Sequence, residues 1–170
     1  MIGTVIGRVA AALVVLAATV DVAANELKPW SGGDTPPLVL SDLGGKRIDL
    51  RKFEKNVVLV NFWATWCAPC IKEMPSLQRL HDQLRARGLV VLAVNMGDNK
   101  EAVEKFLRKV PIALPILLDE SGAASKAWRV LGLPTSFVLA GGKIRYSLIG
   151  DTDWTAPAVS GQISALLPAP

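Results

Sequence analysis

Long apolar runs alternate with amphipathic segments through the middle of the chain. Residues 56–63 (NVVLVNFW) and 89–96 (LVVLAVNM) are continuous and rich in β-branched side chains, which is typical of strands buried on both faces of a sheet. Between them the leucines follow the i, i+3, i+7 spacing of a helix with one apolar face (Leu77, Leu80 and Leu84). Residues 99–110 predict a second helix of the same kind. Strands and helices in this alternation form βαβ units around a central sheet.

Shorter patterns flank these units. Residues 38–50 (LVLSDLGGKRIDL) hold two short apolar runs around a Gly-Gly pair, which predicts a β-hairpin. A second hairpin is predicted over residues 135–150, where it adds antiparallel edge strands, and a last helix follows it. The pattern therefore predicts an α/β fold class, with one domain over residues 38–170 and a central mixed sheet flanked by helices. Residues 25–37, rich in Gly, Pro and polar groups, predict an extended linker.

The first 24 residues have the order of a secretory signal. Arg8 precedes a 12-residue apolar run over 9–20, and small residues follow before Asn25. A membrane anchor is the alternative, because only Arg8 interrupts the apolar stretch from Ile2 and a spanning helix needs about 20 apolar residues. Both interpretations predict export. The protein would lie in the periplasm, or on the outer face of the cytoplasmic membrane if the segment is not cleaved.

Composition and charge narrow the function classes. The chain has 170 residues, 51% of them hydrophobic, which is enough for one domain with its own core. The net charge of +4 comes from scattered Lys and Arg, and no basic run alternates with aromatic residues. The sequence therefore shows no footprint of nucleic-acid binding.

Cys67 and Cys70 are the two cysteines of the chain and lie three apart, in NFWATWCAPC. A structural staple is a weak explanation, because closing so short a loop removes little entropy from the unfolded chain. A zinc site needs four ligands, and the single histidine, His81, is the only further strong candidate. A redox couple is the interpretation that these residues favour, with no metal.

The position of the pair suggests how the two thiols divide the chemistry. Cys67 lies where a strand ends and a helix begins, and the unpaired N–H groups of a helix N-terminus stabilise a thiolate. Cys70 lies one turn further along the same side, so the two sulfurs can form a disulfide. Pro69 suits the first helical turn. We therefore expect Cys67 to be the nucleophile and Cys70 the resolving thiol.

Two motifs carry a family resemblance. VNFWATWCAPCIKEMPSL, together with LGLPTSFVL about 65 residues later, resembles the exported thioredoxin-like proteins of the TlpA/ResA/DsbE type. The resemblance covers about residues 34–167. It implies a thioredoxin-like fold with an added N-terminal β-hairpin, and an activity of thiol–disulfide exchange, usually reducing, that needs no cofactor.

The resemblance also implies a cis peptide bond before Pro134, with Leu133 beside Cys67. There the backbone of Leu133 could pair with a client chain as an extra strand. An ordinary trans turn is the alternative, since most X–Pro bonds are trans. We expect the client-docking surface to include the residues around both motifs, namely Trp66, Ala68, Pro69, Leu133 and Thr135.

Glu73 is the further candidate, three residues past Cys70 on the same helix face. In the proteins that this chain resembles, a glutamate here lies near the thiols and influences their pKa values. A buried carboxylate could take the proton of Cys70, and burial would raise its pKa. The alternative is a solvated glutamate paired with a neighbouring lysine. Asn61 stands where cytoplasmic-type thioredoxins carry a buried aspartate, and an amide is no base.

The direction of electron flow is predicted from the residues between the cysteines. Ala68 and Pro69 offer no donor or charge that would stabilise the thiolate strongly, so a reducing couple is expected rather than a strong oxidant. The resemblance implies clients in cytochrome c or oxidase maturation and a membrane electron donor. Two alternatives stay open: a chaperone that holds Cu(I) through its thiolates, and an oxidase that introduces disulfides.

Overall fold

The computed structural model describes residues 26–169. The predicted signal peptide or anchor, residues 1–24, lies outside them. Within the described range no helix is long and apolar enough to cross a membrane.

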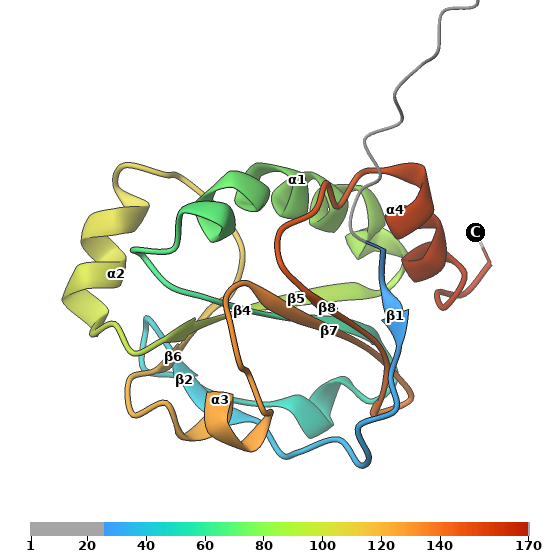
Figure 1. Cartoon of the computed structure of the whole chain (residues 1–170), viewed down its shortest axis with the longest axis horizontal. Helices are drawn as coiled ribbons and strands as arrows, with labels where there is room; N and C mark the ends of the chain where they lie inside the picture. The colour runs from blue at the N-terminus through green and yellow to red at the C-terminus, as the bar shows by residue number, and fades with distance from the viewer. Residues whose placement is uncertain (1–25, 170) are drawn as a thin grey trace, which may run out of the picture.

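One mixed sheet of eight strands forms the centre of the domain, in the order β1-β8-β7-β4-β5-β6-β2-β3 (Figure 1). β4, β5 and β6 are parallel to one another, and the other pairings are antiparallel. The strands are β1 (Lys28–Pro29), β2 (Val39–Asp42), β3 (Arg47–Asp49), β4 (Val57–Trp63), β5 (Leu89–Met96), β6 (Ile116–Asp119), β7 (Thr135–Ala140) and β8 (Lys143–Ile149).

Helices cover both sides of this sheet, as predicted. Figure 1 shows α1, α2 and α4 on one side, and α3 with the short 3-10 helix η1 on the other. The helices are α1 (Ala68–Leu84), α2 (Lys100–Leu107), α3 (Ala123–Ala127) and α4 (Pro157–Ser164), with 3-10 turns η1 (Leu50–Phe53) and η2 (Arg85–Arg87). The β2–β3 hairpin pairs with β6 at the edge of the sheet, which confirms the added N-terminal element.

The alternation of strand side chains divides the core into two faces. Along the fully buried β4, Leu59 and Trp63 point towards α1, whereas Val60 and Phe62 point away from it. We call the cluster under α1, α2 and α4, which includes both cysteines, the disulfide face. The cluster on the other side, centred on three aromatic side chains, is the aromatic face (Phe62, Trp128 and Phe137).

The predicted linker over residues 25–37 differs from the structure. Leu27 is buried in the disulfide face, and its carbonyl oxygen accepts a hydrogen bond from Gln162 Nε2. β1 then pairs with β8, so the second hairpin does not end in an exposed edge strand. The reason is that β8 has unpaired backbone groups on its outer side, and a short extended segment carrying one buried leucine satisfies them.

Candidate active site

A disulfide joins Cys67 and Cys70 at the start of α1, with an S–S distance of 2.01 Å and a Cα–Cα distance of 5.3 Å. Cys67 is the N-cap residue, and its sulfur accepts a hydrogen bond from the backbone N–H of Cys70 at 3.3 Å. Cys67 is 5% exposed and Cys70 is fully buried. Cys67 therefore has the position that the nucleophile needs, at the helix N-terminus and on the solvent side of the pair.

The turn before the disulfide is held by the end of the neighbouring strand. The carboxylate of Asp98, just after β5, accepts hydrogen bonds from the backbone N–H of Thr65 at 2.8 Å and from Asn95 Nδ2 at 2.9 Å. Asp98 was not among the residues predicted from the sequence. Its place directly after a predicted strand could have indicated this contact, since polar residues that follow adjacent parallel strands meet at one edge of the sheet.

The Leu133–Pro134 peptide bond is cis, as the resemblance implied. The carbonyl oxygen of Pro134 accepts a hydrogen bond from Gly150 N–H at 2.9 Å, which ties this loop to the end of β8. Thr135 differs from its prediction as a docking residue. Its side chain is buried, and its hydroxyl donates to the carbonyl of Gly132 at 2.7 Å. Thr135 therefore shapes the loop and does not line a surface.

A groove of about 500 Å³ runs between the disulfide and the cis-proline loop. It is lined by the other predicted docking residues and by neighbours from the same loop (Trp66, Ala68, Pro69, Leu131 and Leu133, with Met96 and Cys67). Trp66 and Leu131 are 68% and 90% exposed. Apolar side chains this exposed are typical of a surface that receives a partner.

Glu73 is 2% exposed, and its carboxylate is held by donors from three parts of the chain. Oε1 accepts from Asn61 Nδ2 at 2.7 Å. Oε2 accepts from the backbone N–H of Thr152 at 3.3 Å and from Trp154 Nε1 at 3.1 Å. The alternative of a solvated glutamate paired with a lysine is wrong, because the neighbouring Lys72 donates instead to Asp151 at 2.7 Å.

The environment of Glu73 brings its titration close to neutral pH. Burial is the largest influence and raises the pKa from 4.5 to about 7, although the hydrogen bonds from Asn61, Thr152 and Trp154 act in the opposite direction. The charge of Asp151 raises the pKa slightly further. A carboxyl group with a pKa near the working pH is suited to both accept and release a proton.

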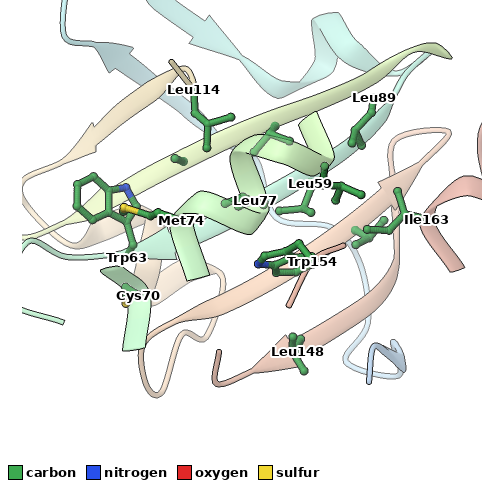
Figure 2. Packing of buried hydrophobic residues seen from close by; sticks show 14 of the residues in the cluster. Leu59, Trp63, Cys70, Met74, Leu77, Leu89, Leu114, Leu148, Trp154 and Ile163 are labelled. Carbon is green, nitrogen blue, oxygen red and sulfur yellow. The ribbon is translucent and has the colours of Figure 1, made fainter. Parts of the chain in front are cut away.

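Trp154 and Thr152 were not among the residues that the sequence singled out. They lie in the segment between β8 and α4, about 80 positions after Glu73, and nothing in their local pattern marks them. Figure 2 shows Trp154 packed beside α1 within the disulfide face, with Cys70 at the start of the same helix. Within residues 26–169, no three His, Cys, Asp or Glu side chains gather closely enough to hold a metal ion.

Comparisons with known proteins agree with this arrangement. The chain is 35% identical over 128 residues to the thiol–disulfide oxidoreductase ResA of Bacillus thuringiensis subsp. konkukian, covering 75% of this chain and 74% of that protein. It is 38% identical over 108 residues to ResA of Bacillus subtilis, covering 64% and 60% of the two chains. Among solved structures it resembles a putative thiol:disulfide interchange protein DsbE from Chlorobium tepidum, with a TM-score of 0.74 and 29% identity over 82% of this chain and 99% of that one.

These likenesses, together with the disulfide at the head of α1, make the chain a thiol–disulfide oxidoreductase of thioredoxin-like fold. Residues 32–147 match the AhpC/TSA family, and the chain belongs to that family. Its relatives there are of the ResA and DsbE type. Enzymes of this class act on the thiols and disulfides of client proteins.

Proposed function

We propose that the protein reduces disulfides of client proteins outside the cytoplasm, with Cys67 as nucleophile, Cys70 as resolving thiol and Glu73 as the acid–base group. The observation that carries the proposal is the placement of a buried carboxyl group with a pKa of about 7 on the helix that begins at the disulfide. A residue that served only stability would be an unexpected occupant of this position, because burying a carboxylate is costly.

The first half of the reaction uses the exposed sulfur. In the reduced protein the Cys67 thiolate attacks one sulfur of a client disulfide, and a mixed disulfide forms. The other client sulfur leaves as a thiolate and takes a proton from water. The N-terminus of α1 favours the thiolate of Cys67, and the apolar Ala68 and Pro69 add no donor that would lower its nucleophilicity further.

The second half needs a base for Cys70, which is fully buried. The Glu73 carboxylate takes the Cys70 proton, and the resulting thiolate attacks the Cys67 sulfur. The bond between Cys67 and the client breaks, the client sulfur leaves as a thiolate, and the carboxyl group passes its proton to it. Two electrons have then moved from the dithiol to the client, and the protein holds the disulfide seen here.

Client docking is assigned to the groove beside Cys67. Trp66, Ala68, Pro69 and Leu133 lie along it. We assign to the backbone of Leu133, just before the cis bond, the pairing with an extended client segment. The segment would then run past Cys67 with its cysteine in reach of the sulfur.

The export segment and the family resemblance support the cellular assignment. An extracytoplasmic reductase needs a membrane electron donor, because the surroundings do not keep its thiols reduced. We assign the clients to cytochrome c or oxidase maturation, and the protein to the periplasm or to the outer face of the membrane.

A trapping experiment tests the order of the two cysteines. Reduced Cys70→Ser should accumulate a mixed disulfide with a disulfide-bonded client peptide, whereas Cys67→Ser should form none. A glutathione titration of the wild type tests the direction of electron flow. The reductase assignment requires a midpoint well below the roughly −120 mV of a strong oxidase. A midpoint near that figure would favour the oxidase, and tight Cu(I) binding without disulfide reduction would favour the chaperone.

A further inference from the structure

Trp154 is bound to the active-site helix at two of its atoms. Its indole N–H donates to Glu73 Oε2 at 3.1 Å, and its backbone N–H donates to Ser76 Oγ at 3.2 Å. The Ser76 hydroxyl in turn donates to the backbone carbonyl of Glu73 at 2.8 Å. The indole is fully buried, so no water competes with it for the carboxylate. One tryptophan thus contacts both the side chain of Glu73 and the turn of α1 that carries it.

The segment that carries Trp154 is also fixed at other points. Asp151 pairs with Lys72 on α1, and the Thr152 N–H donates to Glu73 Oε2. Gly150 is tied to the carbonyl of Pro134. The residues between β8 and α4 therefore join the cis-proline loop to the acid–base group, and the Trp154 side chain reaches the carboxylate through a buried donor.

We propose that Trp154 is a positioning residue for the thiol–disulfide exchange: its indole N–H holds the Glu73 carboxylate in place and stabilises its ionised form. The inference rests on the acid–base role proposed for Glu73. An indole N–H is a donor only, so it bonds to a carboxylate oxygen but gains nothing from a carboxyl O–H turned towards it. Removing this donor should therefore make protonation of Glu73 easier.

The surrounding charges do not offer a substitute for the indole. Lys72 on α1 and Asp151 on the following segment pair with each other, and Asp153 is bonded to Thr155. Asn61 on β4 already divides its amide between Glu73 and Ser136. Loss of one hydrogen bond to a charged group corresponds to a shift of about one pH unit, or roughly tenfold in the protonation constant.

The first test uses Trp154→Phe in the oxidised protein, where the disulfide leaves no thiols to titrate. The titration midpoint of the Glu73 carboxyl group, followed by ¹³C NMR, should move upward by about one unit. Trp128→Phe is the matched control, since its indole donates to the Pro37 carbonyl on the aromatic face and not to a carboxylate. The control should leave the midpoint unchanged. Equal midpoints in wild type and Trp154→Phe would overturn the proposal.

The second test follows the wild-type protein, with Glu73→Gln as its control, and so does not depend on the folding of Trp154→Phe. The ¹⁵N indole resonance of Trp154 should titrate with the midpoint of Glu73 and should lose this transition in Glu73→Gln. An indole resonance that ignores Glu73 would contradict the positioning role. If the Glu73 midpoint moves in Trp154→Phe but the pH profile of disulfide reduction does not, Trp154 positions the carboxyl group as proposed, and the acid–base function of Glu73 is the part that fails.

Discussion

The two faces of the sheet differ in the side chains that they bury. On the aromatic face, Phe137 packs edge-on against Trp30, Phe62 and Trp128. Phe62 and Trp128 also contact each other, with their rings tilted. The ring centroids of Phe62, Trp128 and Phe137 lie 5.1–6.1 Å apart. On the disulfide face, polar side chains are buried together with the redox pair (Asn61, Glu73, Ser76, Asn95, Ser136 and Thr152).

The difference shows how one domain separates stability from chemistry. Aromatic packing stabilises the folded state through the burial of apolar area and through favourable ring geometry. A buried carboxyl group costs free energy, and its hydrogen bonds only offset that cost. This cost is not confined to the disulfide face, because the Asp119 carboxylate is also buried on the other side, where it accepts hydrogen bonds from the first backbone N–H groups of α3. The disulfide face differs in that its carboxyl group lies on the helix that begins at the redox pair. We infer that its polar groups are retained for the exchange reaction, while the aromatic face supplies the stability that tolerates them.

The largest effect is expected on the aromatic face. Phe137→Ala should lower the free energy of unfolding by about 3–5 kcal/mol, because it leaves a cavity and removes three ring contacts. Denaturant unfolding of the oxidised protein measures it. The folded variant should keep the wild-type midpoint potential. A change of more than about 30 mV, equivalent to 1.4 kcal/mol, would show that the two faces are not separable.

Glu73 is expected to give the next largest effect, through the pH dependence of stability. Its pKa is raised from 4.5 to about 7 on folding, so the folded state holds a proton that the unfolded chain has lost between these pH values. Its contribution is fully present below pH 4.5 and is lost as pH rises through 7, by about 3 kcal/mol in all.

Glu73→Gln should therefore remove this downward slope between about pH 5 and 7, since the amide does not titrate. Urea unfolding of the oxidised wild type and variant at several pH values gives both slopes. Parallel slopes would mean that Glu73 titrates alike in the folded and unfolded chains, and that its burial has no part in the chemistry.

The sequence predicted the parts of the disulfide face that depend on local pattern. The apolar run of β4 and the leucine spacing of α1 define the strand, the helix and the cysteine pair between them, because each depends on residues close together in the chain. Glu73 marks the limit of this reasoning. Its spacing places it on the side of the thiols, but whether that side is covered depends on Trp154, which is 81 positions away.

The errors have the same origin. Lys28–Pro29 is a strand because β8 needs a partner, and a two-residue strand carries no periodicity of its own. Thr135 turns inward because the carbonyl of Gly132 comes within hydrogen-bond reach when the loop closes. These features depend on how distant or irregular segments meet. Hydrophobic pattern does not encode that, whereas the cis bond was available through the family motif around Pro134.

A smaller effect is expected at the open side of the disulfide face. Leu131 is 90% exposed beside the groove, so Leu131→Ser should leave the unfolding free energy within about 0.5 kcal/mol of the wild type. Client reduction should fall by roughly tenfold in kcat/KM if this leucine contacts the client, because one buried apolar side chain contributes about 1.5 kcal/mol or more. Val39→Ser, an exposed position on the β2–β3 hairpin, is the control and should not affect reduction. Equal losses in both variants would mean that the groove is not the docking surface.

The smallest effect concerns a charge at the border of the disulfide face. The negative charge of Asp151 raises the pKa of Glu73, but its effect is smaller than those of burial and of the hydrogen bonds. Asp151→Asn should lower the Glu73 midpoint, both by removing the negative charge and by freeing Lys72 from its partner. The shift should be less than about one unit, since interactions of exposed charges amount to about 0.2–1 kcal/mol. Asp153→Asn is the matched control, because Asp153 lies two residues away and bonds to Thr155 instead. ¹³C NMR titration of the oxidised proteins measures all three midpoints. A midpoint that rises in Asp151→Asn would show that the ion pair acts by holding the Thr152–Trp154 donors against Glu73, and that geometry outweighs charge at this border.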